Sequence, residues 1–131
     1  MTFSVKLHKY CDGVEKLIDA YVDARIGLDG IKENIKAGKI AFYGVYGDKV
    51  LIGFLLIRID VNYAGSEEMV VMYSQCLKKI DRPFFSFLGE LYDQIANGRR
   101  IRIHSERRAI DKVIEQQGFK FVEAVYIREP Q

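Results

Sequence analysis

Along this chain, segments in which apolar and polar residues alternate are separated by segments in which apolar residues recur every three or four positions. The first segment, residues 2–10, alternates with a period of two, as a half-buried strand does. Its apolar positions are Phe3, Val5 and Leu7. Asp12 then precedes Glu15 by three residues, which is the spacing of a capping box, and apolar residues follow at helical spacing. We expect a strand and then a helix that Asp12 caps.

A second, shorter helix and a hairpin follow. Asp29 can cap this helix, and Gly38 is placed to end it. Segments 40–46 and 50–60 then flank "GDK", a hairpin signal with glycine at the tip. Residues 50–60 are apolar at almost every position, so this strand should be central and covered on both faces.

The second half of the chain repeats the alternation of strands and helices. After the polar turn "NYAGSEE", a strand is expected over 69–73. Pro83 fits the first turn of a helix over 84–97, which Asn97-Gly98 ends. The remaining expected elements are a strand over 100–104, parallel to 69–73, a helix over 106–117 that Ser105 caps, and a strand over 119–127.

The resulting order is β-α-α-β-β-β-α-β-α-β, an α/β domain with a mixed, twisted sheet. No linker, repeat or low-complexity segment divides the 131 residues, so we expect a single domain over 1–131. The longest apolar run, residues 50–57, is too short to span a bilayer, and we expect no membrane segment.

Charge and composition narrow the class of protein. The formal charge of +2 gives no electrostatic basis for binding nucleic acid. Cys11 and Cys76 are far apart in the sequence and lack a metal-ligand spacing, which indicates reduced thiols in a cytosolic protein. His8 and His104 are the only histidines and neither has a close ligand partner, so no metal site is expected.

The element order, the hairpin "FYGVYGDKVLIGFLLI" and the ending "QQGFKFVE" resemble the GCN5-related N-acetyltransferase (GNAT) superfamily. The resemblance implies acetyl-coenzyme A (acetyl-CoA) as cofactor and an amine as acceptor. In that superfamily a glycine-rich loop after the fourth strand, of pattern R/Q-x-x-G-x-G/A, holds the pyrophosphate through its backbone N–H groups. Here no glycine lies between Gln75 and Phe87.

The loop pattern falls on residues 78–83, with Asp81 and Pro83 at the two glycine positions. Pro83 removes one N–H donor, and Asp81 brings a carboxylate towards the phosphates. Cationic side chains can bind phosphate instead, in an arrangement that salt weakens, or they are simply solvated while Asp81 caps the helix. These candidate cofactor-binding cations are Lys78, Lys79 and Arg82.

The resemblance also implies candidates for catalysis. The tyrosine that protonates the departing thiolate in many members is replaced here by Ile114, whose spacing suits the core. Glu67 or Glu68, at the start of the fourth strand, and His104, at the end of its parallel neighbour, are candidate bases. Alternatively, both carboxylates are surface groups and His104 is a strand-end residue. Tyr73 and Ser74 end the fourth strand, where the pantetheine arm would enter.

The sequence is consistent with two functions. One is an acetyl-CoA-dependent N-acetyltransferase that acts on an amine. The other is a non-catalytic binding or structural module on the same fold, similar to phage or prophage accessory proteins, some of which are virion-associated. The residue 78–83 segment favours the second function for the cofactor, whereas Glu68 and His104 keep the first open.

Overall fold

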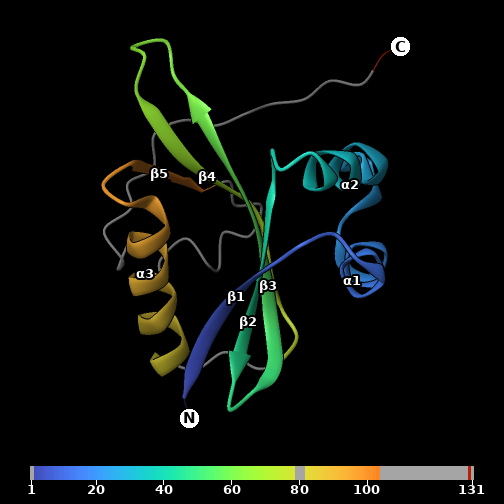
Figure 1. Cartoon of the computed structure of the whole chain (residues 1–131). Coiled ribbons are helices and arrows are strands. Elements are labelled where there is room, and N and C mark those ends of the chain that lie inside the picture. Colours follow the sequence, from blue (N-terminus) through green and yellow to red (C-terminus); the bar gives the residue numbers. More distant parts are fainter. Residues whose placement is uncertain (1, 79–81, 104–129, 131) are drawn as a thin grey trace.

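The computed structural model describes residues 2–78, 82–103 and 130, and Figure 1 shows how their elements are arranged. The sheet lies between two layers of helices, with α1 and α2 on one face and α3 on the other (Figure 1). In chain order the elements are β1 (Phe3–His8), α1 (Asp12–Tyr21), the 3-10 helix η1 (Ala24–Ile26), α2 (Leu28–Lys36), β2 (Ala41–Gly47), β3 (Val50–Val61), β4 (Glu67–Cys76), α3 (Arg82–Ala96) and β5 (Arg100–Ile103).

The described strands form one mixed sheet in the order β1-β2-β3-β4-β5. Neighbouring strands are antiparallel from β1 to β4, whereas β4 and β5 are parallel, with Met69 opposite Ile101. The predicted α/β class and the parallel pair are therefore confirmed. Four predicted features lie outside the described residues: the helix over 106–117, the strand over 119–127, His104 and Ile114.

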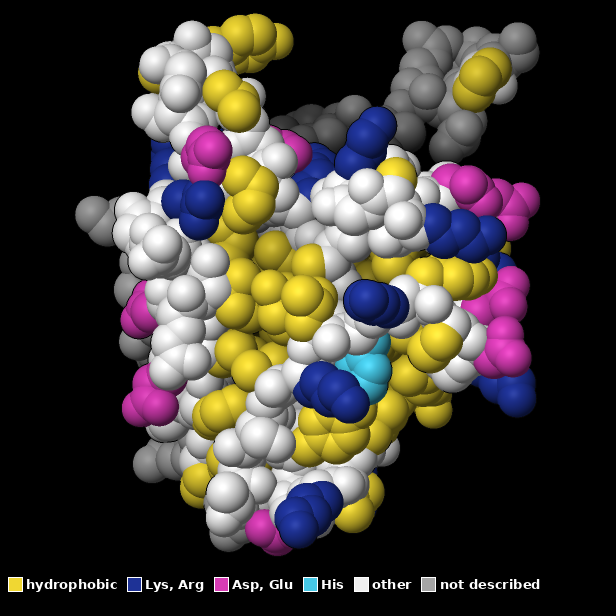
Figure 2. Space-filling view, viewed as in Figure 1, with side chains coloured by type: hydrophobic (Ala, Val, Ile, Leu, Met, Phe, Trp, Pro, Cys, Tyr) yellow, Lys and Arg dark blue, Asp and Glu magenta, His cyan; other side chains and the backbone are white. Residues whose placement is uncertain are grey.

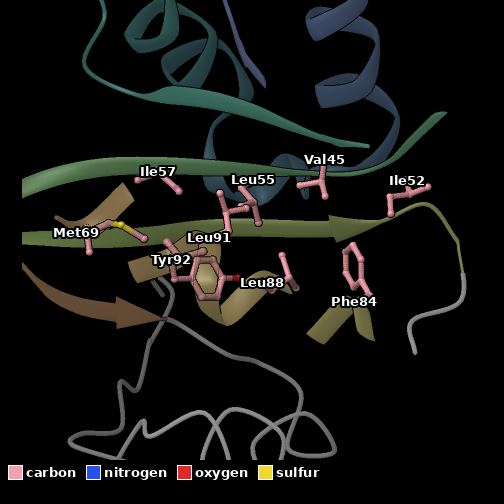
Figure 3. Close-up of a cluster of buried hydrophobic side chains, with 11 residues drawn as sticks. Val45, Ile52, Leu55, Ile57, Met69, Phe84, Leu88, Leu91 and Tyr92 are labelled. Atoms are coloured by element: carbon pink, nitrogen blue, oxygen red, sulfur yellow. The ribbon is translucent and has the colours of Figure 1, made fainter. Parts of the chain in front are cut away.

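β3 contributes to both cores, because successive side chains of a strand point to opposite faces. Leu55 and Ile57 pack with α3, whereas Phe54 and Leu56 pack with α1 and α2. All four side chains are buried. Figure 3 shows the cluster on the α3 side, where Leu88, Leu91 and Tyr92 meet the sheet. The prediction of a central strand covered on both faces is confirmed for residues 52–57, whereas Val50 and Ile59, near the two ends of β3, are exposed.

α3 forms because its apolar residues recur on one face. Phe84, Leu88 and Leu91 are buried, and Tyr92 and Ala96 extend the buried face. Pro83 lies in the first turn, where no intrahelical N–H bond is needed. The helix ends at Ala96 and is followed by Asn97 and Gly98, whose backbones are left-handed, with φ of 49° and 85°.

Two helix starts differ from the prediction by one or two residues. The N-cap of α1 is Cys11, without a side-chain cap bond, and Asp12 is the first helical residue. The N-cap of α2 is Gly27, and Asp29 lies within the first turn. Both carboxylates still lie in the first turn of their helices, where the helix dipole favours negative charge. The cap pattern therefore predicted each helix start to within two residues.

The tip of the β2–β3 hairpin also differs from the prediction. Gly47 ends β2, and the two left-handed positions are Asp48 and Lys49, with φ of 49° and 69°. Two positive φ angles in a two-residue loop make a type I′ turn, which matches the twist of the strands. Asp48 accepts a hydrogen bond from the Thr2 N–H at 2.8 Å, so the tip is tied to the start of β1.

The alternation predicted for β1 holds only in part. Phe3 and Val5 are half-buried against the α3-side core, whereas Leu7 is 59% exposed. β1 lies at one edge of the described sheet, and Leu7 is not among the residues that pack against the α3-side core. The alternation of polar and apolar residues therefore predicted the strand, but not which of its apolar side chains are buried.

Candidate functional site

A β-bulge interrupts β4 at Met72. On β3, Leu56 lies opposite Tyr73 and the next residue, Ile57, lies opposite Val71, so Met72 is an extra residue. The described pairing of β4 with β5 ends at the same level, with Val71 opposite Ile103, while β4 continues to Cys76. Because a bulge bends its strand and increases the twist, it directs the last part of β4 away from the line of β5.

The hydrogen-bond pattern fixes which backbone groups of β4 face β3. The Leu77 N–H donates to the Ile52 oxygen at 2.8 Å, so residues 77, 75 and 73 face β3 in this antiparallel ladder. The N–H and C=O of Ser74 therefore point to the side where β5 lies further up the sheet. The Ser74 side chain is exposed. This stretch of β4 can bind an extended, amide-containing ligand by strand-like pairing.

Tyr73 faces the opposite side of the sheet from Ser74. Its ring packs against Phe54, with the ring centroids 5.9 Å apart. Its hydroxyl lies 2.6 Å from the Tyr21 carbonyl oxygen and 2.7 Å from Gln75 Oε1, so one O–H is shared between two acceptors. Tyr73 thus joins the end of α1 to the end of β4, and of the two predicted residues Ser74 is the more accessible to a ligand.

Gly53 allows β3 to approach the end of β4 closely. A Cβ atom at this position would lie 2.7 Å from the Gln75 carbonyl oxygen, which is closer than real side chains come to backbone. A glycine within an apolar strand is a sequence signal for such an approach. Neither this contact nor the Met72 bulge was predicted, and the run over 69–73 carries no mark of an extra residue.

In the sequence, the predicted phosphate-binding cations fall after β4 and at the first residue of α3. Lys78 is exposed, and Arg82 is the first residue of α3. The Arg82 side chain, Lys79 and Asp81 lie outside the described residues. Pro83 is exposed at the second position of α3, so one of the orphan N–H donors of this helix start is missing.

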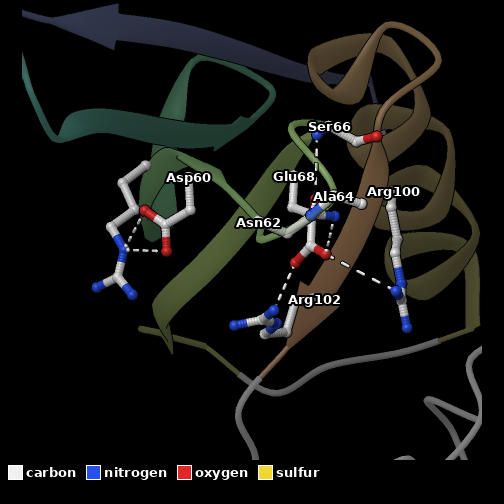
Figure 4. A network of polar contacts seen from close by, with 8 residues as sticks. Asp60, Asn62, Ala64, Ser66, Glu68, Arg100 and Arg102 are labelled. Atoms are coloured by element: carbon white, nitrogen blue, oxygen red, sulfur yellow. Dashed lines mark hydrogen bonds and ion pairs between the residues drawn. The ribbon is translucent and has the colours of Figure 1, made fainter.

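Glu68 is buried at the other end of β4, with only 2% of its surface exposed, and Figure 4 shows its contacts. Asn62 Nδ2 donates to Glu68 Oε1 at 2.9 Å. Arg102 Nη2 lies 2.6 Å from Oε2, and Arg100 Nη1 lies 3.7 Å from Oε1. The hydrogen bond from Asn62 and then the two guanidinium charges lower the pKa of Glu68, although burial opposes them.

Glu68 is therefore not adjacent to Ser74. It lies opposite Arg100, at the first pair of β4 with β5, and four residues before the bulge, which is about 13 Å along a strand. Glu67 is exposed and pairs with Arg99 at 2.6 Å. The alternative in which both carboxylates are surface groups is right for Glu67 and wrong for Glu68.

The described residues hold no group of three or more His, Cys, Asp or Glu side chains that could bind a metal ion. Among the same residues, no helix has the length and apolar character needed to cross a membrane. Cys11 is exposed and Cys76 is half-buried, and these two residues do not form a disulfide.

No known family model matches this sequence, and no curated protein matches it. Solved structures do match. A ribosomal-protein-alanine N-acetyltransferase from Brucella melitensis biovar Abortus 2308 superposes with a TM-score of 0.71 at 17% identity, covering 98% of this chain and 99% of that one. A probable acetyltransferase superposes with a TM-score of 0.70 at 14% identity over 100% of both chains. The fold is that of the GCN5-related N-acetyltransferases.

A third match on the GNAT fold is a complex with a ligand. It is the aminoglycoside N-acetyltransferase AAC(6')-Iy in complex with CoA, with a TM-score of 0.65, 14% identity and coverage of 99% of this chain and 95% of that one. Identities this low establish the fold alone, so the activity of this chain has to follow from its own residues. The resemblance inferred from the sequence is confirmed for the fold. The likeness to phage or prophage proteins stays a prediction.

Proposed function

We propose that this protein is an acetyl-CoA-dependent N-acetyltransferase that transfers an acetyl group to an amine at the carboxyl end of β4. The observation that carries the proposal is the bulge at Met72 of this GNAT fold. The bulge lies at the level where the described pairing of β4 with β5 ends. The GNAT-fold structure that contains CoA supports this choice of cofactor.

The residues after the bulge fit an extended pantetheine arm. Its amide groups can pair with the backbone N–H and C=O of Ser74, which face away from β3. Bound acetyl-CoA would supply an acetyl thioester for attack by the amine. Met72 and Ser74 would fix the direction of the arm, and Tyr73 would hold this part of β4 against α1.

The phosphate end of the cofactor fits less well. The first turn of α3 contains Pro83, and no glycine allows the preceding loop to approach a pyrophosphate closely. We therefore propose that the side chains of Lys78, Lys79 and Arg82 neutralise the phosphates. Exposed cations bind loosely and are screened by salt, so affinity for acetyl-CoA should be weak at physiological ionic strength.

The base that deprotonates the amine is proposed to be His104, which follows the last described β5 residue in the sequence. Glu68 remains the other predicted base. Its lowered pKa and its contacts with Asn62 and Arg102 favour a structural contribution, because a carboxylate held in its ionised form accepts a proton poorly.

A second candidate function is a non-catalytic binding module on the same fold. The observation that favours it is again Pro83, together with the absence of glycine between Gln75 and Phe87. A partner protein would then take the place of the small-molecule substrates, as in the predicted phage or prophage accessory proteins.

Mass spectrometry of amine acceptors distinguishes the two functions. The protein is incubated at low salt with millimolar acetyl-CoA and two acceptors, an aminoglycoside and a peptide with an N-terminal alanine. These are the acceptor classes named by two of the matching enzymes. We expect one acceptor to gain a single acetyl group. No acetylated product from either acceptor, with a broader set of amines also negative, would favour the binding module.

A matched pair of variants tests the location of the site. Ser74→Pro removes an N–H that does not bond to β3, whereas Ser74→Ala keeps it. We expect Ser74→Pro to lower kcat/KM at least tenfold and Ser74→Ala to change it little. Equal activity in both variants, with folding retained, would place the cofactor elsewhere.

A further inference from the structure

One edge of β3 extends past its neighbour β2. The last pair between these strands is Ala41 with Ile57, but β3 continues to Val61, which lies opposite Glu67 of β4. In Figure 1 this part of the β3–β4 hairpin projects beyond the rest of the sheet. Over residues 58–61, no described strand lies on the β2 side of β3.

The direction of the backbone groups along this edge follows from the ladder. The Asn62 N–H donates to the Ser66 oxygen at 2.9 Å, as the Ile52 oxygen accepts from Leu77 at the other end. Even-numbered β3 residues therefore bond to β4, and odd-numbered ones face β2 or the open edge. Ile59 and Val61 thus direct their N–H and C=O groups outward, away from β4.

The side chains of the same segment divide by chemistry. Ile59 is 44% exposed and Val61 is 68% exposed, on one face. Arg58 and Asp60 lie on the other face, where Arg58 Nε is 2.9 Å from Asp60 Oδ1. Tyr63, in the turn beyond, is fully exposed. An edge with this much apolar exposure is usually protected in native proteins, and here the described strands leave it open.

A groove of about 910 Å³ lies beside this edge. It is lined by α2, by the start of β2, by β3 and by the end of α3, and its lining includes Ile31, Asn34, Ile40, Ile59 and Ile95. Figure 2 shows hydrophobic side chains gathered on this face, between the projecting hairpin and α2. The open edge and the groove together can hold another hairpin.

We propose that the β3 edge pairs with the same edge of a second copy of this chain, antiparallel, about a two-fold axis at Asp60. This register places Ile59 opposite Val61 of the second copy and Val61 opposite its Ile59. Each pair consists of residues whose N–H and C=O face outward, so the backbones exchange four hydrogen bonds. A two-fold interface requires that the same residues on the two copies complement one another, and the edge residues Ile59 and Val61 do so in this register.

Charge complementarity favours a second copy over an unrelated partner. In this register Arg58 lies diagonally across from Asp60 of the second copy, within reach of a long side chain. The existing Arg58–Asp60 pairs of the two copies then form one cluster of two positive and two negative charges. This inference does not depend on the proposed activity.

Sedimentation velocity over a range of concentrations tests the dimer, with a matched pair of variants. Val61→Pro removes only an outward-facing N–H, and its neighbour Asp60 is already extended, so the monomer fold should persist. Val61→Thr keeps the N–H and the β-branched shape. We expect a wild-type dimer, at least a tenfold higher dissociation constant in Val61→Pro, and a smaller change in Val61→Thr. A wild-type monomer at all concentrations, or equal effects of the two variants, would overturn the proposal.

Disulfide cross-linking tests the register. In a background with Cys11→Ser and Cys76→Ser, Asp60→Cys should form a cross-linked dimer on oxidation. Directly opposed residues of this type lie about 4.5 Å apart at Cα, within the range for a disulfide. Arg58→Cys is the control, because its two copies would be four residues apart along the strands, about 13 Å. No cross-link at position 60, or equal cross-linking at both positions, would overturn the two-fold axis at Asp60.

Discussion

At the scale of single residues, the carboxylate of Glu68 is buried and both of its oxygens are contacted by polar side chains. It lies next to Met69 and Val70, both buried, and burial of an unpaired charge there would cost several kcal/mol. Asn62 and Arg102 offset that cost by contacting its two oxygens. Asn62 Oδ1 also accepts hydrogen bonds from the N–H groups of Ala64 and Ser66, so the same residue shapes the turn before β4.

Replacing Glu68 with glutamine should therefore destabilise the fold. We expect Glu68→Gln to lower the free energy of unfolding by about 1–3 kcal/mol near neutral pH, because Arg102 loses a buried partner. Glu67→Gln is the control, since its exposed pair with Arg99 should be worth about 1 kcal/mol or less. Urea unfolding of both variants and of the wild type measures the difference.

The same variant makes a prediction about pH. The folded-state pKa of Glu68 lies below its usual value of 4.5, so the carboxylate stabilises the fold above that value. This contribution is lost as the pH falls through the lowered pKa. The difference between wild type and Glu68→Gln should therefore shrink on acidification. A difference that grows towards acid, or no difference from Glu67→Gln at neutral pH, would show that the pairing is not stabilising.

At the scale of elements, the close approach of β3 to β4 at Gly53 fixes the last part of β4. A Cβ at this position meets the Gln75 carbonyl oxygen at 2.7 Å, and the contact is with backbone, which cannot turn aside. We expect Gly53→Ala to destabilise the protein by about 1–3 kcal/mol, as overpacking does, and to reduce the proposed transfer activity. Thermal unfolding and the acetylation assay measure the two effects.

Gly30→Ala is the control for this prediction. Gly30 lies within α2 and has no atom within 4 Å of an added Cβ. Alanine there should stabilise the helix by about 0.5–1 kcal/mol. If Gly53→Ala proved as mild as Gly30→Ala, the β3–β4 contact would not be needed to position the end of β4.

The elements differ in how much of them the sequence could predict. α3 and β3 were predictable because a stripe such as Phe84, Leu88 and Leu91, or a continuous apolar run, depends only on local order. The Met72 bulge was not predictable, because a run of apolar residues has the same pattern whether or not one of its residues is unpaired. The contact of Glu68 with Arg102 depends on the parallel register of β4 and β5, which residues far apart in the sequence determine together.

At the scale of the whole molecule, the order of strands and helices, together with the hairpin sequence and the ending "QQGFKFVE", predicted the GNAT fold, which the solved structures confirm. The site was less predictable. The sequence indicated Ser74 and the cations after it, but whether the cations hold a ligand depends on side-chain positions that no local pattern fixes. Fold and activity therefore have to be tested separately, and the weakest link between them is the phosphate end of acetyl-CoA.

The shift of the melting temperature by acetyl-CoA tests this account most directly. A ligand at about 100 times its dissociation constant stabilises a fold by about 2.7 kcal/mol, which is roughly 5–15 °C for a domain of this size. With millimolar acetyl-CoA we predict a shift of a few degrees at about 10 mM salt, where the Debye length is about 30 Å, and almost none at about 150 mM, where it is about 8 Å. Lys78→Ala and Lys79→Ala should each reduce the low-salt shift. A large shift that persists at high salt and that neither variant reduces would contradict the account, because backbone donors would then hold the pyrophosphate despite Pro83.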